Sequence, residues 1–233
     1  MRVLAIESAT NVAGVAVVAE DAVIAEAILN NGKTHSQRLM PVLARLLEEA
    51  ELALEDLDGI VVSGGPGSFT GLRIGMATAK GLAFAGHKPL ITVSTLDSLA
   101  YNVKGYPYLI CPVLNARRNE VYTAVYRDAG EDLEMVMPYA ALAPAELVAR
   151  LLPLPEPVMF LGDGVPVFGA FFQEQLGSRA QVATVFASMP RAAVLGWLGI
   201  KKLRNGQVAD LVTAKPFYIR TSEAEAKWQQ KNR

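Results

Sequence analysis

One stretch of the chain combines residue types that could hold a phosphate group or cap a helix: Gly64, Gly65, Pro66, Gly67, Ser68, Phe69, Thr70 and Gly71. It follows an apolar run at 59–62 and precedes a segment rich in Ala and Gly, which predicts a turn between a strand and a helix. Glycines in such a turn let an anion or another backbone come close to free N–H groups. The stretch does not end in Gly-Lys-Ser/Thr and does not fit Gly-x-Gly-x-x-Gly, so neither common nucleotide motif is present. We therefore expect the glycines to permit the turn, with Ser68 or Thr70 capping the helix.

Metal and nucleophilic chemistry have little support in the sequence. The two histidines, His35 and His87, lie in separate segments, and neither has a second histidine four residues on, so no metallopeptidase ligand set is predicted. Neither a histidine nor a lysine lies close enough in sequence to activate Ser68 or Thr70 as a nucleophile. The single cysteine, Cys111, lies in an apolar run and is expected to be buried in the core.

The composition describes a globular chain with a sizeable core. Of its 233 residues, 52% are hydrophobic and 19% are charged, which fits one large domain or two small lobes. The net charge of −1 argues against a protein whose main task is to bind nucleic acid, and we interpret the basic clusters at 117–118, 201–204 and 227–233 as solvated surface. A carboxylate as early as Glu7 argues against a signal peptide, and no apolar run is long enough to span a membrane. A cytoplasmic protein is expected.

The predicted elements follow one plan twice. In the first half we expect strands at 3–7, 14–19 and 22–29, a helix at 36–52, a strand at 60–63, the glycine turn, a helix at 71–85, a strand at 90–94 and a short helix at 95–103. In the second half we expect strands at 108–115, 120–127 and 133–137, a helix at 144–152, a strand at 157–161, a helix at 167–176, a strand near 182–185 and a helix at 190–204. Pro41 disfavours a regular helix because proline has no N–H and crowds the preceding turn. The first helix should therefore begin near Met40 or be kinked in its first turn.

This layout resembles the superfamily of actin, the sugar kinases and the heat-shock chaperones. The resemblance implies a two-lobed α/β fold of the ribonuclease H type, with duplicated βββαβα units. We expect an N-terminal lobe of residues 1–104 and a smaller C-terminal lobe of residues 105–233, whose last helix or tail is a candidate to pack back on the first lobe.

Members of that superfamily bind ATP between the lobes, with one acidic residue in the first hairpin and another in the second. Here the first hairpin has Glu7 and Thr10 without a glycine, and the second has Asn115, whose neutral amide cannot hold a hydrated magnesium ion. Asp163, in a second glycine turn, is a further acidic candidate. We interpret these four as hairpin and turn residues, and residual nucleotide binding remains the alternative.

Two predicted helices are apolar on more than one face. Along 71–85, small residues form two stripes at i, i+4 spacing, and each glycine there costs about 1 kcal/mol relative to alanine. The helix at 36–52 likewise has apolar residues beside its core line. Either both are core helices of an α/β sandwich, or they also form a helix–helix association face. The residues predicted for that face are Leu39, Met40, Leu43, Leu47, Arg73, Met76, Ala77 and Lys80.

The glycine stretch, extended to Gly75, closely resembles the signature of the TsaB family, bacterial proteins needed to make threonylcarbamoyladenosine at position 37 of tRNA. Supporting similarity lies at 4–10, 35–41, 93–96, 115–122 and 216–220, so the resemblance covers most of the chain. Glu7 and Asn115 depart from the family pattern, which usually has Asp at both positions.

The resemblance implies a non-catalytic partner of TsaD, the transferase that passes the threonylcarbamoyl group to tRNA. TsaB would pair with TsaD through the helices at 36–52 and 71–85, form homodimers when alone, and work with the small ATPase TsaE. TsaD has a His-x-x-x-His metal site, whereas Leu39 stands four residues after His35 here. We therefore expect no enzymatic activity and no cofactor, with ATP entering only through partners, tRNA contacted only indirectly and no membrane. A small ATP-dependent kinase or ATPase of the same fold is the alternative.

Overall fold

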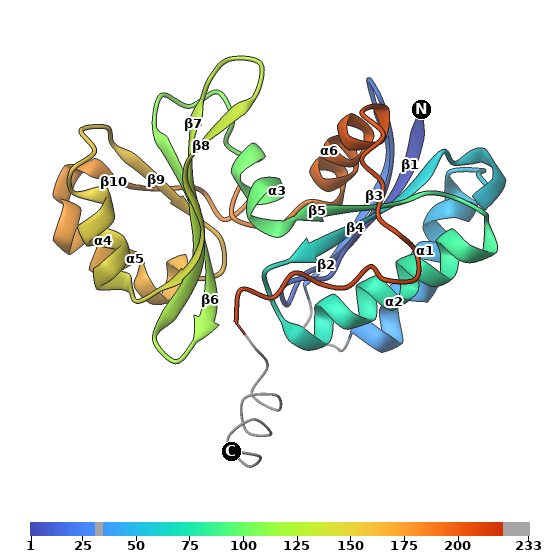
Figure 1. The fold of residues 1–233 in the computed structure, drawn as a ribbon, viewed down its shortest axis with the longest axis horizontal. Coiled ribbons are helices and arrows are strands. Elements are labelled where there is room, and N and C mark those ends of the chain that lie inside the picture. The colour runs from blue at the N-terminus through green and yellow to red at the C-terminus, as the bar shows by residue number, and fades with distance from the viewer. Residues whose placement is uncertain (31–34, 221–233) are drawn as a thin grey trace, which may run out of the picture.

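Two mixed sheets with the same topology organise the molecule (Figure 1). The computed structural model describes residues 1–30 and 35–220. The first sheet has the order β3-β2-β1-β4-β5, and the second has the equivalent order β8-β7-β6-β9-β10. In each sheet the first three strands form antiparallel pairs, and the last two run parallel to the first. This repeat confirms the predicted duplicated, two-lobed α/β fold.

The elements follow the predicted order, and most of their bounds lie close to the predicted ones. The strands are β1 (Arg2–Glu7), β2 (Ala13–Ala19), β3 (Val23–Leu29), β4 (Gly59–Gly65), β5 (Leu90–Ser94), β6 (Leu109–Arg117), β7 (Glu120–Asp128), β8 (Leu133–Leu142), β9 (Val158–Leu161) and β10 (Ala180–Val182). The helices are α1 (His35–Glu49), α2 (Phe69–Ala85), α3 (Thr95–Tyr101), α4 (Pro144–Leu151), α5 (Val165–Leu176) and α6 (Ala192–Arg204), with short 3₁₀ turns at Leu54–Asp56 and Gly177–Arg179.

Three details differ from the sequence prediction. Strand β8 extends to Leu142 because it keeps pairing with β7 beyond the predicted end. Strand β10 begins before the predicted 182–185 and ends at Val182, since its pairing with β9 starts at Ala180. Helix α1 begins at His35 and passes through Pro41. Proline is tolerated there because the carbonyl that its missing N–H would have used belongs to Gln37, an exposed residue that water can reach.

The first sheet is covered on both faces. Along β1, Leu4 and Ile6 pack in the core beneath α1 and α2, whereas Val3 and Ala5 pack in a second core with α6. Helix α6 approaches so closely that a Cβ atom on Gly199 would lie 2.3 Å from Val61 Cγ2. The last helix of the chain therefore completes the first sheet. The division at 104/105 itself stays a prediction.

The second sheet has its own core, and α3 lies at the junction of the two sheets. Phe160 and Phe172 stack with ring centroids 4.4 Å apart where α5 packs on the second sheet. On the other side, Leu96 and Leu99 of α3 pack with residues of β6 and β7 (Figure 1). Helix α3 thus fills the space between the lobes with apolar side chains.

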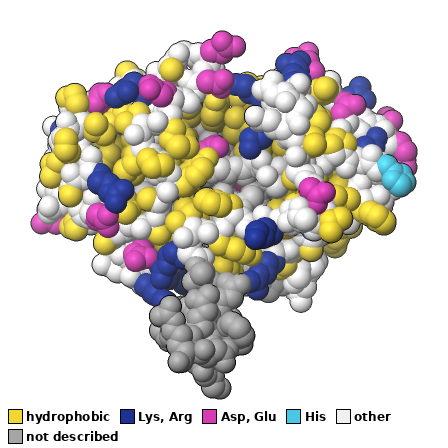
Figure 2. Space-filling view, in the orientation of Figure 1, with side chains coloured by type: hydrophobic (Ala, Val, Ile, Leu, Met, Phe, Trp, Pro, Cys, Tyr) yellow, Lys and Arg dark blue, Asp and Glu magenta, His cyan; other side chains and the backbone are white. Residues whose placement is uncertain are grey.

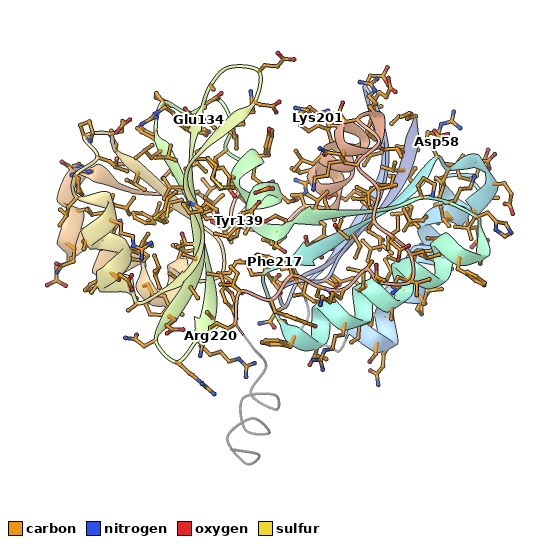
Figure 3. The ribbon with its side chains drawn as sticks, viewed as in Figure 1. Asp58, Glu134, Tyr139, Lys201, Phe217 and Arg220 are labelled. Carbon is orange, nitrogen blue, oxygen red and sulfur yellow. The ribbon has the colours of Figure 1, made fainter. Side chains whose placement is uncertain are left out.

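Residues 205–220, here called the C-terminal strap, run from α6 along α2 to the second sheet (Figure 1). Ala209 N donates to Leu90 O over 2.8 Å at the edge of the first sheet. Farther along, Phe217 N donates to Gly64 O over 2.7 Å. The strap ends at Arg220, whose guanidinium pairs with Glu120 of β7 (Figure 3). It therefore fastens one lobe to the other across the end of β4.

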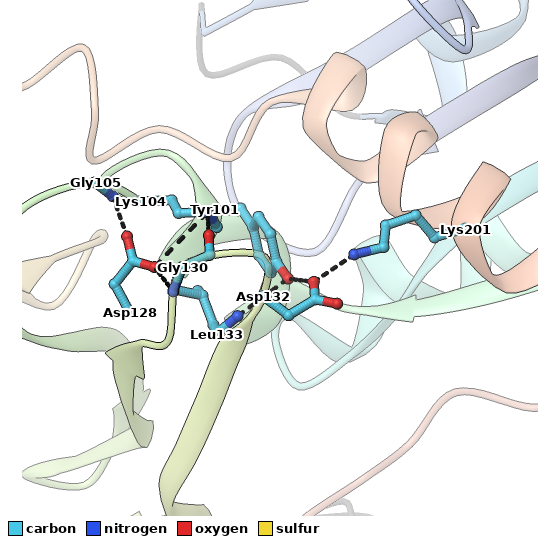
Figure 4. Close-up of polar contacts among 8 residues, drawn as sticks. All are labelled: Tyr101, Lys104, Gly105, Asp128, Gly130, Asp132, Leu133 and Lys201. Atoms are coloured by element: carbon cyan, nitrogen blue, oxygen red, sulfur yellow. Dashed lines mark hydrogen bonds and ion pairs between the residues drawn. The ribbon is translucent and has the colours of Figure 1, made fainter.

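A polar network joins the lobes on the opposite side, as Figure 4 shows. Asp132, in the turn after β7, accepts hydrogen bonds from the Tyr101 hydroxyl of α3 and the Lys201 ammonium of α6. These two hydrogen bonds hold the pKa of Asp132 below its usual range, and the bond from Lys201 is the main cause. We call Tyr101, Asp132 and Lys201 the junction network.

Candidate functional site

The glycine-rich turn is packed directly against the turn between β1 and β2. A Cβ atom on Gly67 would lie 2.3 Å from Ala9 O, and one on Gly71 would lie 2.1 Å from Ser8 O. Real Cβ atoms do not come this close to a carbonyl oxygen, so only glycine fits at either position. The glycines therefore serve the approach of one backbone to another.

Two N–H groups of this turn, those of Ser68 and Gly71, have partners in the chain. Ser68 N donates to Ala9 O over 2.7 Å, and Gly71 N donates to Ser68 Oγ over 3.3 Å. Ser68 is thus the helix cap, and Thr70, the other candidate, is not. A phosphate cradle needs several unused N–H groups in one concave turn. The bonded N–H groups of Ser68 and Gly71 are not available for that role.

The first half of the turn is closed from the other side by the C-terminal strap. Gly65 has φ of 104°, a left-handed conformation that favours glycine, and a Cβ atom on it would lie 2.6 Å from Phe217 O. Gly64 accepts the hydrogen bond from Phe217 N, and Pro66 is buried. The signature is therefore the place where the strap, β4 and the first hairpin meet.

A cleft of about 720 Å³ lies between the lobes, beside this turn. Its lining comes from the first hairpin, the start of α2, the β6–β7 hairpin and the end of the strap: Ala9, Thr10, Asn11, Gly67, Ser68, Phe69, Thr70, Leu114, Asn115, Ala116, Arg117, Arg118, Tyr122, Asp163 and Arg220. The structure thus brings together Thr10, Asn115 and Asp163 of the four residues that the sequence suggested for residual nucleotide binding.

The polar groups of the second hairpin mostly hold the hairpin itself. Asn115 N donates to Asp163 Oδ1 over 2.9 Å, and Asn115 Oδ1 accepts from Arg117 N over 2.9 Å. Across the cleft, Thr10 Oγ1 accepts from Val12 N over 3.1 Å. These contacts agree with the interpretation of all three as hairpin and turn residues.

Glu7, the fourth residue of that set, does not line the cleft. Its side chain is completely buried, and Glu7 Oε1 accepts from Ala9 N over 2.7 Å. Burial raises the pKa of Glu7 to about 7, and the hydrogen bond from Ala9 offsets only part of that increase. Glu7 is therefore corrected from a candidate cofactor ligand to a buried carboxyl group.

Metal binding has no support in the described residues either. Across 1–30 and 35–220, no group of three His, Cys, Asp or Glu side chains could hold a metal ion. His35 begins α1, and its Nε2 lies 2.7 Å from Thr10 O.

Cys111 is fully buried, as predicted, and burial raises the pKa of its thiol to about 12. Within the described ranges, no helix is long and apolar enough to cross a membrane.

The predicted association face divides into buried and exposed residues. Leu39, Leu43 and Met76 are at most 4% exposed and belong to the core beneath α1 and α2. Their prediction as surface contacts is wrong, because their side chains point into the chain's own sheet. Leu47 is half-buried against the same core.

Two further residues of the predicted face bind the strap. Lys80 Nζ donates to Val212 O and Ala214 O over 2.9 and 3.1 Å. Arg73 Nε donates to the Tyr218 hydroxyl over 3.1 Å. Both cations therefore hold the strap on α2, a role that sequence analysis missed because the partners lie more than 130 positions away.

A set of exposed small and apolar residues of α1 and α2 forms what we call the outer helix face. Two of them, Met40 and Ala77, were predicted from the sequence. The complete face consists of Met40, Pro41, Ala44, Ala77, Gly81 and Phe84. Phe84 is 73% exposed, and a Cβ atom on Gly81 would meet nothing within 4 Å. The small-residue stripe of Ala77, Gly81 and Ala85 was the signal for this face, since the other stripe, Gly71, Gly75 and Ala79, packs inside.

Comparison with known proteins places these features in a family. Residues 22–228 match the family model described as TsaD, tRNA N6-adenosine threonylcarbamoyltransferase. The chain is 39% identical over 228 residues to the tRNA threonylcarbamoyladenosine biosynthesis protein TsaB of Bacillus subtilis, with 98% of each chain covered. It is 31% identical over 232 residues to the TsaB protein of Escherichia coli, with 96% of each covered.

Solved structures agree with the sequence comparison. YeaZ from Pseudomonas aeruginosa superimposes with a TM-score of 0.77 at 28% identity, covering 93% of this chain and 99% of that one. An activator of 2-hydroxyisocaproyl-CoA dehydratase from Clostridium difficile, solved with bound ADPNP, gives a TM-score of 0.50 at 12% identity, covers 88% of this chain and 98% of that one, and shares the fold alone. Together with the signature turn and the duplicated sheets, these similarities show that the chain belongs to the TsaB (YeaZ) family of tRNA threonylcarbamoyladenosine biosynthesis proteins.

Proposed function

We propose that this chain is an accessory subunit of the assembly that makes threonylcarbamoyladenosine in tRNA, and that it binds and activates a TsaD-type transferase paralogue. The names of its relatives support the pathway, and the match to the transferase family model supports a paralogous partner. Activation would be a coupling free energy between two proteins, in which this chain favours the active arrangement of the transferase.

The observation that carries the proposal is the outer helix face. Small and apolar residues, among them Ala77 and Gly81, line an exposed stripe of α2, which lets a partner helix come close. Beside them Phe84 offers a large apolar side chain, of the kind that anchors protein interfaces. An α-helical hairpin of a paralogue with the same fold would present a similar pair of helices.

The cleft supports an accessory role better than a catalytic one. The N–H groups of Ser68 and Gly71 are already bound inside the chain. Asn115 offers an amide in place of a carboxylate. We derive no nucleotide-dependent step from these residues, and nothing favours the alternative of a small kinase or ATPase. ATP would then act in the complex through a TsaE-type ATPase. The complex would work in the cytoplasm. The free chain would form a homodimer through its outer helix face.

Calorimetric titration of the chain with the TsaD-type paralogue of the same organism tests the proposal. We expect one-to-one binding, micromolar or tighter. Ala77→Arg should abolish the heat of binding, because it places a bulky charge on an exposed, small-residue stripe without entering the core. Gly81→Arg should have the same effect, since its side chain meets no neighbour in the free chain.

A matched control separates docking from folding. Ala170→Arg makes the same change at an exposed position of α5, in the other lobe, and should leave binding unchanged. Thermal unfolding of all three variants should resemble that of the original chain. Binding that survives both α2 variants, or a chain that binds Mg-ATP and ignores the paralogue, would overturn the proposal.

A further inference from the structure

Three arginines gather at the mouth of the cleft between the lobes. Arg117 and Arg118 lie at the end of the β6–β7 hairpin, and Arg220 lies at the end of the C-terminal strap. Lys and Arg side chains are visible along this lower edge, where the lobes meet (Figures 2 and 3). Among the residues that line the cleft, Asp163 is the acidic one. Glu120, which pairs with Arg220, and Asp163 offset two of the three positive charges, so the described side chains of the mouth keep a net positive charge.

The hairpin backbone is arranged to present these charges. Arg117, Arg118 and Asn119 have φ of 61°, 52° and 59°, so three successive residues are left-handed. Asn115 Oδ1 holds this tip through its hydrogen bond with Arg117 N. Both arginines are exposed, and both line the cleft.

Aromatic rings stand beside the arginines. Phe69 lines the cleft and stacks on Tyr218 with ring centroids 4.6 Å apart. The Arg73 guanidinium carbon lies 5.9 Å from the Tyr218 ring centroid, and Phe217 is 49% exposed. Guanidinium groups together with aromatic faces are the combination that binds unpaired nucleic acid, because the arginines contact phosphates and the rings stack on bases. An acidic peptide would use the arginines and have no need of the rings.

The turn beside the arginines argues against a small phosphate ligand. Ser68 N donates to Ala9 O, so it is not one of the N–H groups that could surround a nucleotide's phosphates. The charges lie at the rim of the cleft, where an extended polyanion can reach all of them.

We propose that the cleft mouth formed by Arg117, Arg118, Arg220 and Phe69 binds the phosphodiester backbone of an unpaired stretch of RNA. The inference rests on the proposed function, which makes tRNA the substrate of the assembly. It replaces the expectation that tRNA is contacted only indirectly. The net charge of the chain is only −1, so we expect this mouth to supply part of the complex's affinity for tRNA and the transferase subunit to supply the rest.

The test measures tRNA binding by the complex of this chain with its TsaD-type paralogue, using fluorescence anisotropy over a range of potassium chloride concentrations. The variant is Arg117→Asn combined with Arg118→Asn, because asparagine suits left-handed backbone and keeps the hairpin. We expect affinity for an unmodified tRNA transcript to fall about five- to tenfold near 0.1 M salt. The plot of log K against log salt should become less steep by about 0.7 for each phosphate that the arginines no longer neutralise.

Two controls make the outcome decisive. Arg150→Asn removes an exposed arginine from α4, far from the cleft mouth in sequence, and should change neither the affinity nor the slope. Assembly with the paralogue is measured separately for the original chain and for each variant, so a failure of the original chain to assemble would count against the proposed function alone. Intact assembly with unchanged tRNA affinity and slope would overturn the RNA proposal. Loss of inorganic phosphate or ADP binding by the double variant, with tRNA binding unchanged, would overturn it in favour of a small-anion site.

Discussion

At the scale of the residue, Glu7 shows how burial changes a charge. It ends β1 with no exposed surface, and its Oε2 atom has no hydrogen-bond partner in the described residues. Desolvation favours the neutral carboxyl group and raises its pKa from 4.5 to about 7. Between these pH values the folded chain keeps a proton that the unfolded chain has lost.

This difference predicts a pH-dependent stability. The free energy of unfolding should fall as pH rises from about 4.5 to about 7, because the folded state binds more protons in that range. Glu7→Gln should remove this decline and be more stable than the original chain near pH 8, by up to about 3 kcal/mol. Urea unfolding at several pH values measures it. The exposed Glu48→Gln serves as control, and a decline that persists in Glu7→Gln would show that another group causes it.

Single residues also mark the limit of sequence analysis at the site. The hydroxyl spacing in the signature predicted a cap, and Ser68 is that cap. By contrast, no local pattern could show that Arg73 and Lys80 hold the strap, because their partners come from the far end of the chain. Nor could spacing show that Met76 points inward, since either flank of a helix rich in small residues is compatible with the core.

At the scale of the element, α2 has glycines with opposite roles. A Cβ atom on Gly71 would lie 2.1 Å from Ser8 O, whereas a Cβ atom on Gly81 would meet nothing within 4 Å. Both residues lie within the same helix. Helix propensity favours alanine over glycine at both positions, so only packing can make the effects of substituting the two glycines differ.

This contrast gives a paired prediction. Gly81→Ala should stabilise the chain by about 0.5–1 kcal/mol, because alanine restricts the unfolded backbone and nothing obstructs its methyl group. Gly71→Ala should destabilise it by about 2 kcal/mol or more, because the first hairpin must move away from α2. Thermal unfolding of both variants measures the difference. Equal effects would mean that the first hairpin is not held against the helix.

The order of the elements was predictable, and the reasons are local. Short apolar runs bounded by turn residues predicted the strands, although the predicted 182–185 shares only Val182 with β10, and the repeated order indicated the duplicated fold. The ends of the strands and helices were less predictable, because they depend on contacts with other elements. Strand β8 continues to Leu142 because β7 offers a partner, and α1 includes Pro41 because the affected carbonyl faces water. Contacts between distant elements, such as those of the strap, leave no periodic trace in the sequence.

At the scale of the whole molecule, two of the contacts that join the lobes lie on opposite sides. The strap joins them across the signature turn, and the junction network joins them on the opposite side through Asp132. The Lys201–Asp132 pair is partly exposed, with side chains 34% and 55% accessible, so solvent weakens it. The aromatic ring of Trp197 supports the same lysine at 5.0 Å.

Asp132→Ala should therefore have a small and salt-dependent effect. The free energy of unfolding should fall by about 1 kcal/mol or less, because water can partly replace Asp132 as the partner of Lys201 and Tyr101. The effect should shrink in about 1 M salt, where surface charges are screened. Urea unfolding at low and high salt checks this, with the neighbouring Glu131→Ala as control. A large effect that ignores salt would mean that the network acts through packing.

The position of α6 has a consequence during protein synthesis. Val3, Ala5 and Val61 leave the ribosome early, but α6, the helix that covers them, is made only after the strands β1 to β10. Throughout that interval the nascent first sheet exposes one apolar face. Such a surface is prone to aggregation and to capture by chaperones. Premature termination shortly before Ala192 would release a chain that contains all ten described strands but lacks the helix that covers one face of its first sheet.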